Sequence, residues 1–349
     1  MYDYSGAIHM HSNYSFDGNT SVESIIESAK RAGLDFIVIT DHLRLDAKNA
    51  GYEGWHDGVL VLVGEEITPK YNHYVALGID KPVIAWKEKS VPQEYIDKVA
   101  EQGGTGLIAH PDHTGAPKFG IKGYPWKDWS VKGYAGLGIW DLMTDWQEKL
   151  VSTGAAAFAY IFPDFVLSGP KKETLERWDA LNACGRIAGY GEIDNHNSLK
   201  RYFGLNFRIF PFDFAFSTIR THVLLNEQLN RDFRAAHKQI IDAIRNCRLY
   251  VAQEHGASAK GFMFRIYNSE ETATTGMEFR LTDKPTMLET RLPLPGLIRV
   301  VRNGETIYEE YKKHANLEID RLGVYRIEAF RKKMGFLKPW IFSNPIWVV

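Results

Sequence analysis

The stretch TSVESIIESAKRAGLDFIVITDH, residues 20–42, decides the fold class. Thr20 and Glu23 form a capping box, and apolar residues at helical spacing follow until Gly33, which predicts a helix over residues 20–33. Residues 34–40 are rich in β-branched side chains and too few for a buried helix, which predicts a strand that ends at Asp41 and His42. A helix followed directly by a buried strand is typical of α/β proteins.

The same alternation continues outward along the chain. We expect further strands at residues 59–63, 106–109, 137–140 and 186–193, and helices near residues 93–101 and 173–183. Strands that alternate with helices imply parallel pairing, in an α/β barrel or a doubly wound sheet.

After about residue 255 the pattern changes to short alternating segments without helices. Asn303-Gly304 stands between two β-rich arms and predicts a two-residue hairpin. Residues 324–330 and 340–349 add strands. We therefore expect a first domain over residues 1–255 and a small C-terminal β-sandwich-like domain over residues 256–349.

Composition disfavours several classes of partner. The 349 residues include 42 Lys and Arg against 43 Asp and Glu without a basic run, so no nucleic-acid partner is expected. No apolar stretch approaches the roughly 20 residues of a membrane helix, so no membrane partner is expected. The N-terminus does not resemble a secretion signal, and Cys184 and Cys247 are typical of buried thiols, which favours a cytoplasmic location. The oligomeric state stays open.

Histidines and carboxylates gather where the predicted strands end. His9 and His11 alone would be ordinary surface residues, although on a strand they would share one face. The carboxyl ends of parallel strands open onto a common face, where ligands bind. We therefore expect nine potential metal ligands to converge there: His9, His11, Asp17, His42, Glu65, His73, His110, Asp194 and His196.

Other polar residues near these positions receive weaker assignments. Glu66 follows Glu65 and points to the opposite side if the strand continues, so we expect it away from the metals. Glu192 shares a face with Asp194, and we favour a place behind the ligands over a place among them. His113 follows His110 closely enough to touch substrate, or is a loop residue without a role.

The motifs together resemble a known family. HMHS at 9–12, TDH at 40–42, GEEI at 64–67 with HYVALG at 73–78, AHP at 109–111 and DNH at 194–196 resemble the polymerase and histidinol phosphatase (PHP) family of metal-dependent phosphoesterases. RTHVLL at 220–225 and PWIFSNPIWVV at 339–349 resemble its carbaryl-hydrolase-related branch, whose barrel carries a C-terminal β domain.

The resemblance implies a distorted seven-stranded β/α barrel with two or three divalent metal ions, Zn, Mn or Fe. It places His9, His11, Glu65 and Asp194 on the first ion, Glu65, His73 and His110 on the second, and Asp17, His42 and His196 on the third. Asp17 stands where many members of the family have histidine.

We expect a hydrolase that acts on a small phosphomonoester. Metal-bound hydroxide is the expected nucleophile, so no side chain is assigned as catalytic. Arg44, Arg201 and His113 are the expected substrate contacts, since arginine suits phosphate. The alternatives are a carbamate, ester or amide hydrolase, a phosphodiesterase, and a metal-holding binding module without turnover.

Overall fold

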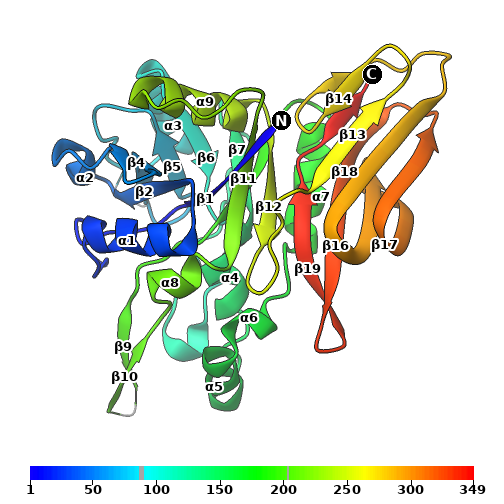
Figure 1. The fold of residues 1–349 in the computed structure, drawn as a ribbon. Coiled ribbons are helices and arrows are strands. Elements are labelled where there is room, and N and C mark those ends of the chain that lie inside the picture. Colours follow the sequence, from blue (N-terminus) through cyan, green and yellow to red (C-terminus); the bar gives the residue numbers. More distant parts are fainter. Residues whose placement is uncertain (86–89, 203) are drawn as a thin grey trace.

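The computed structural model describes residues 1–85, 90–202 and 204–349 of the chain (Figure 1). Among these residues, no helix is long and apolar enough to cross a membrane. The first part of the chain mixes helices and strands: β1 (Tyr2–Ile8), α1 (Val22–Ala32), β2 (Phe36–His42), α2 (Asp46–Asn49), β3 (Gly54–His56), β4 (Val59–Ile67), β5 (Tyr74–Leu77), α3 (Pro92–Glu101), β6 (Thr105–Ile108), the 3-10 helix η1 (Pro117–Phe119), β7 (Gly136–Asp141), α4 (Leu142–Gln147), α5 (Thr153–Ile161), α6 (Pro163–Val166), α7 (Lys172–Asn182), β8 (Ala188–Glu192), β9 (Leu199–Tyr202), β10 (Leu205–Arg208), α8 (Phe212–Ala215), β11 (Ile219–Leu225), α9 (Phe233–Arg245) and β12 (Leu249–Gln253). The second part consists of strands: β13 (Met263–Tyr267), β14 (Thr272–Thr274), β15 (Glu278–Phe279), β16 (Thr286–Arg302), β17 (Glu305–Ile319), β18 (Gly323–Lys333), β19 (Phe336–Ser343) and β20 (Ile346–Val348).

Helix α1 forms where the sequence predicts it, with a different cap. The side chain of Ser21 accepts a hydrogen bond from the backbone N–H of Ser24, so Ser21 rather than Thr20 is the N-cap. Gly33 ends the helix at φ 67°, a conformation that glycine adopts without steric cost.

The strand pairing is mixed. β1, β2 and β4 are parallel neighbours, and so are β6, β7 and β8. β5 runs antiparallel to both β4 and β6. The expectation of parallel pairing is therefore wrong at β5, because the short loop after β4 reverses the chain without a crossover helix.

The ends of β8 and β1 lie side by side. Ile193 N donates to Ile8 O over 3.1 Å, and His11 N donates to Asn195 O over 3.0 Å. These bonds link β8 to β1 at the end of the strands where the predicted ligands lie, while β11 pairs with the first part of β1. The seven-stranded barrel itself remains a prediction.

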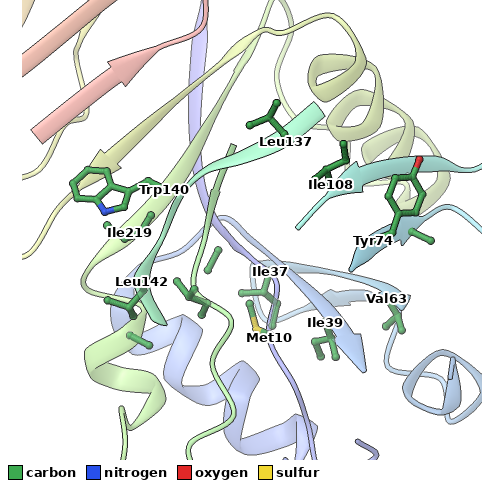
Figure 2. Close-up of a cluster of buried hydrophobic side chains, with 14 of the residues drawn as sticks. Met10, Ile37, Ile39, Val63, Tyr74, Ile108, Leu137, Trp140, Leu142 and Ile219 are labelled. Atoms are coloured by element: carbon green, nitrogen blue, oxygen red, sulfur yellow. The ribbon is translucent and has the colours of Figure 1, made fainter. Parts of the chain in front are cut away.

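Apolar side chains cover both faces of this sheet. One face, which includes Ile37 and Val63 (Figure 2), packs on α1 and α3. The other face, which includes Val38 and Leu62, packs on α9. Because both faces are buried, β2 and β4 are apolar at every position until the polar residues at their ends.

The C-terminal part is all-β, as predicted, and is joined to the first part by hydrogen bonds. β12 pairs antiparallel with β11 on one side and with β19 on the other. Asn344, after β19, accepts the N–H of Gly189 in β8 at 2.8 Å and donates to its carbonyl at 2.7 Å. The predicted hairpin turn lies between β16 and β17, with Asn303 and Gly304 at φ 51° and 83°. The boundary at residues 255 and 256 remains a prediction.

A buried ion pair also joins the two parts. Arg326 of β18 is 3% exposed and donates to both carboxylate oxygens of Asp179 in α7, over 2.6 and 2.8 Å. Its remaining terminal nitrogen donates to Glu328 over 2.7 Å. This bidentate geometry fixes β18 against α7.

Candidate metal centre

The strand ends bring eight of the nine predicted ligands together. Among the described residues, three groups of donor atoms lie close enough to hold a metal ion, and all donors of a group lie within 4.8 Å of one another. The groups are His9, His11, Glu66 and Asp194; Glu66, His73 and His110; and His11, Asp17, His42 and His196.

The first group surrounds one point at the ends of β1, β4 and β8. Glu66 Oε2 lies 3.3 Å from His9 Nε2 and 3.5 Å from His11 Nε2. Asp194 Oδ1 lies 3.5 and 3.3 Å from the same two nitrogens. The side chain of Asp194 is 15% exposed and the other three are at most 1% exposed, so solvent reaches this group from the Asp194 side.

The second group uses the other oxygen of the same carboxylate. Glu66 Oε1 lies 2.9 Å from His73 Nδ1 and 3.2 Å from His110 Nε2. Because Oε2 faces the first group and Oε1 the second, the Glu66 carboxylate has the position of a bridging ligand.

The third group is the most open. Asp17 Oδ2 lies 3.3 Å from both His42 Nε2 and His196 Nε2. The His11 ring stacks on the rings of His42 and His196, with centroids 4.3 and 4.0 Å apart. The Asp17 side chain is 37% exposed, so this group lies at the edge of the site.

The prediction that Glu65 is a ligand and that Glu66 points away from the metals is wrong. Glu65 lies outside the three groups, and Glu66 lies at their centre. Glu65 Oε1 instead accepts the backbone N–H of Val83 at 2.6 Å, and burial raises the pKa of Glu65 to about 8. The two side chains do face opposite sides of β4, but both sides are apolar up to this point, so alternation alone could not tell which side holds the ligands.

Unusual backbone conformations concentrate at this site. Eleven described residues other than glycine have positive φ, and six of them are predicted ligands or their chain neighbours. Such conformations are costly for side-chain-bearing residues and persist where the surrounding structure imposes them. Here they turn the chain at the strand ends: His9, Leu43, Asn72, His110, Asp194 and Asn197.

Fixed acceptors orient the histidine rings. His9 Nδ1 donates to Glu192 Oε2 over 2.8 Å, and His73 Nε2 donates to the carbonyl of Pro69 over 3.0 Å. The other nitrogen of each ring then faces the donor groups with its lone pair. Glu192 also accepts the backbone N–H of His110 at 2.5 Å, so it lies behind the ligands, as the sequence favoured.

The donor set fits divalent cations. His9 Nε2, His11 Nε2 and Glu66 Oε2 are buried and make no hydrogen bond of good geometry within the described part of the chain, although His42 Nδ1 lies 2.9 Å from Glu66 Oε2. Burying such atoms is costly unless a cation or a proton lies between them. The four nitrogen–oxygen separations in the first group, 3.3–3.5 Å, match the roughly 3.4 Å between ligands of a tetrahedral ion with bonds of about 2.1 Å.

The close packing of these side chains shifts their pKa values. Burial by itself lowers the pKa of His42, but the carboxylates of Glu66 and Asp17 outweigh it and raise that pKa to about 10. Burial and the charges of His196 and His42 lower the pKa of His11 to about 3. The carboxylates thus hold positive charge on only some of the clustered rings.

The two predicted arginine contacts, Arg44 and Arg201, differ in their surroundings. Arg44 follows β2 closely, and its Nη1 donates to Tyr14 O over 2.6 Å, in the loop that carries Asp17. Arg201 is exposed on β9. Arg208, which was not predicted as a site residue, ends β10 and donates to Asn197 Oδ1 over 3.2 Å, beside the third group.

The expectation that His113 touches substrate does not fit the structure. His113 is 4% exposed, and both ring nitrogens are engaged, one with Gln147 Oε1 at 2.8 Å and the other with the N–H of Tyr124 at 3.1 Å. Its ring also stacks on Tyr124. His113 therefore belongs to the wall that supports His110.

Asp141 was not predicted as a site residue, although it directly follows the strand predicted at residues 137–140. Burial and the charges of Asp194 and Glu192 raise the pKa of Asp141 to about 7, and its carboxylate caps α4. Asp141 lines a cavity of about 110 Å³ that opens beside the second group, together with His110, Asp145, Lys149 and Lys171. The cavity offers room next to the donor groups for part of a small molecule.

The comparison with protein families identifies the N-terminal part of the chain. Residues 7–117 match the family model of the PHP domain. The resemblance inferred from the motifs is therefore confirmed for this segment, which contains six of the eight clustered predicted ligands. Asp194 and His196 lie beyond the matched residues, and the carbaryl-hydrolase-related branch remains a prediction.

The chain is also similar to individual proteins. An uncharacterized protein of Methanocaldococcus jannaschii is 30% identical over 116 residues, which are 30% of this chain and 66% of that protein, slightly under two thirds of its length. A two-domain protein from Bacteroides vulgatus that contains a predicted PHP-like metal-dependent phosphoesterase aligns over 99% of this chain and 95% of its own, at 13% identity and a TM-score of 0.47. A putative metal-dependent phosphoesterase from Bifidobacterium adolescentis aligns over 58% of this chain and 92% of its own, at 18% identity and a TM-score of 0.37. TM-scores of this size are too low to assign a function.

Proposed function

We propose that this chain hydrolyses a small phosphomonoester with two or three divalent metal ions, Zn, Mn or Fe. The observation that carries the proposal is the Glu66 carboxylate, whose two oxygens face two different histidine groups. A carboxylate between two ions is the arrangement of two-metal hydrolytic sites, which act on phosphoesters without a side-chain nucleophile.

The candidate ligands differ in solvent exposure, and this difference indicates where the substrate enters. Ions bound here would neutralise phosphate charge and lower the pKa of a bound water. The second group is at most 9% exposed, so its side chains hold their position away from solvent. Asp17, Asp194 and His196 have side chains 37, 15 and 17% exposed, so the substrate approaches from their edge.

Cationic side chains near this edge would bind the phosphate. Arg44 and Arg208 are each held by a hydrogen bond to a segment that carries a member of the third group. The register Leu199↔Arg208 and Arg201↔Asn206 puts Arg208 at the base of the hairpin and Arg201 nearer its tip. We therefore rank Arg208 above Arg201 as a phosphate contact.

The pairing of strands supports the predicted barrel. The ladder runs β1, β2, β4, β5, β6, β7 and β8, and the Ile193–Ile8 hydrogen bond returns it to β1. Such a closed set of seven strands would explain why ligands from β1 and β8 meet.

Metal analysis combined with a substrate panel tests the proposal. We expect at least two ions per chain after loading with Zn, Mn or Fe, and turnover of phosphomonoesters that a chelator abolishes and the metal restores. The panel also contains phosphodiesters and aryl carbamates, at equal concentrations. Asp194→Asn serves as the matched variant, since it removes one candidate ligand charge at the exposed edge.

Three results would contradict the proposal. Fewer than one ion per chain at excess metal would refute the metal site. Turnover restricted to carbamates or to phosphodiesters would assign the site to a different bond. Full metal loading without turnover on any member of the panel would indicate a binding module.

A further inference from the structure

One end of the molecule combines exposed apolar side chains with basic ones. It is built from four segments, residues 114–122, residues 151–162 with α5, the hairpin of β9 and β10, and residues 331–338 between and within β18 and β19. Figure 1 shows α5, this hairpin and the turn between β18 and β19 at the lower end of the view. We call this the basic apolar surface.

Contacts between the segments make the surface continuous. Phe119 of the first segment packs edge-on against Tyr202 of β9, with ring centroids 5.9 Å apart. Tyr160 of α5 packs against Phe207 of β10 at 5.4 Å. The fourth segment joins through Phe336, whose ring lies 5.9 Å from that of Phe165 in α6.

The charges of this surface are of one sign. The four segments contain nine basic residues and no acidic one, in a chain whose 42 basic and 43 acidic residues nearly cancel. Asp164 of α6 and Glu148, which accepts from Thr114 Oγ1, border the segments, and each is paired with a lysine, Asp164 with Lys333 and Glu148 with Lys171. Six of the cations are exposed to solvent: Lys118, Lys122, Lys200, Arg201, Arg208 and Lys332.

The apolar side chains of this surface are unusually exposed. Of the 21 exposed large apolar side chains among the described residues, ten belong to the four segments. Ile161, Leu205 and Met334 are 65, 64 and 81% exposed. The whole set is Val151, Phe158, Tyr160, Ile161, Phe162, Leu199, Leu205, Met334, Phe336 and Leu337.

We propose that the basic apolar surface binds peripherally to an anionic phospholipid bilayer. Aliphatic side chains at protruding tips gain by entering the acyl boundary, while surrounding lysines and arginines attract anionic head groups. Nucleic acid would match the charge and the four exposed aromatic rings, but stacked bases offer no partner to Ile161, Leu205 and Met334, the three most exposed apolar side chains of this surface. A second copy of this chain would bring nine more cations against the same surface.

This proposal is independent of the phosphoesterase reaction. The absence of a long apolar stretch concerns membrane-spanning helices and has no bearing on a surface of this kind. The hairpin of β9 and β10 begins three residues after His196, so the surface lies at the ligand-bearing end of the strands. Binding would therefore turn the candidate metal centre toward the bilayer.

Vesicle co-sedimentation of the full chain tests the proposal. The probes are vesicles of phosphatidylcholine alone and of equal parts phosphatidylcholine and phosphatidylglycerol. We expect at least about tenfold tighter binding to the anionic vesicles, weakened by high salt. Lys122→Glu with Lys200→Glu should reduce this binding about tenfold or more, and Ile161→Ser with Leu205→Ser should also reduce it by several fold.

The matched control alters the opposite end of β18. Arg321→Glu with Leu322→Ser changes one exposed cation and one exposed apolar side chain in the turn before that strand, and binding should stay within twofold. Circular dichroism checks that all variants are folded. Equal binding to both kinds of vesicle, no binding to either, or an equal loss in the control would overturn the proposal. A dimer that Ile161→Ser with Leu205→Ser dissociates, or tighter binding to duplex DNA than to vesicles, would overturn it in favour of those partners.

Discussion

His42 and Glu66 are register partners on the parallel strands β2 and β4, with 2.9 Å between His42 Nδ1 and Glu66 Oε2. Partners in a parallel pair point to the same face of the sheet. The same register places Asp41 beside Glu65 on the other face. The pairing of β2 with β4 therefore places the side chains of His42 and Glu66 on the same side of the sheet.

This relationship predicts opposite results for two isosteric variants. Glu66→Gln should lose at least one metal ion per chain, because an amide cannot bridge two ions through two anionic oxygens. Its activity should fall by more than the roughly 10–100-fold loss expected when a residue that only supports a ligand is changed. Glu65→Gln is the control and should keep its metal, since Glu65 accepts from Val83 outside the three groups. Elemental analysis measures the metal content of both variants, and phosphatase assays measure their activity. Metal lost from Glu65→Gln and kept by Glu66→Gln would reverse the assignment.

Glu192 should tune metal affinity without contacting metal. Glu192→Gln places an amide opposite His9 Nδ1–H or the backbone N–H of His110, both of which need an acceptor. We expect metal binding to weaken about 10- to 100-fold, measured by competition with a chromogenic chelator. Asp145→Asn is the matched control, since this buried carboxylate accepts from the backbone of Ser168. Equal affinity in Glu192→Gln and the native chain would leave Glu192 a packing role only.

Arg208 should contribute to phosphate binding. Arg208→Met is expected to cost about 1.5–3 kcal/mol of substrate interaction, which is roughly a tenfold to hundredfold loss of kcat/KM on a phosphomonoester. Arg201→Met, nearer the hairpin tip, should cost less. Steady-state kinetics at matched metal content compare the two. A larger loss in Arg201→Met would restore the ranking expected from the sequence.

The buried pair of Arg326 and Asp179 should dominate the stability of the contact between α7 and β18. Arg326→Met leaves the carboxylate of Asp179 without its cation and Glu328 with Arg299 alone, at 3.0 Å, and should lower the free energy of unfolding by about 3–5 kcal/mol. Arg321→Met alters an arginine that is 71% exposed and should change it by at most about 0.5 kcal/mol. Urea denaturation measures both. A small effect of Arg326→Met would mean that water reaches these carboxylates.

His222 predicts a pH dependence of stability that is separate from the metal centre. Burial lowers the pKa of His222, but hydrogen bonds to Asp3 and Glu254, at 2.7 and 3.2 Å, outweigh it and raise that pKa above its ordinary value. A histidine whose pKa is raised by folding contributes its full stabilisation below its pKa in the unfolded chain, about 6.5. This stabilisation disappears as the pH rises through its pKa in the folded chain. Burial raises the pKa of Glu254, but His222 lowers it further, to about 2, so its contribution is present above 4.5 and lost as the pH falls toward 2.

His222→Gln should therefore destabilise the chain more at pH 5.5 than at pH 9. Urea denaturation at both pH values measures the difference from the native chain. His314→Gln changes a histidine that is 51% exposed and should show little difference at either pH. A destabilisation by His222→Gln that is the same at both pH values would show that His222 is neutral when folded.

Most of the site could be predicted because its residues occupy strand ends. His42 ends β2, and Asp194 follows β8, where the sequence changes from apolar to polar residues. The choice between Glu65 and Glu66 could not be made from periodicity, because helices cover one face of β4 and the opposite side of the sheet is apolar too. It depends on the pairing with β2, which is a tertiary contact.

Other features needed the tertiary structure for similar reasons. β5 is only four residues long and antiparallel, and its direction follows from the loop that precedes it. Positive φ at His9 and Asp194 turns both side chains beyond the ends of regular strands, where alternation no longer applies. Arg208 approaches Asn197 only because β9 and β10 form a hairpin.

The hydrogen bonds between Gly189 and Asn344 connect positions 155 residues apart, and they complete a strand that leads to Asp194. At the usual 5–20 residues per second, the ribosome adds Asn344 about 8–30 s after Gly189. During this interval the backbone of the nascent β8 lacks its amide partner and is open to other strands or to chaperones. The order of synthesis therefore makes the assembly of this strand end depend on a part of the chain that is made much later.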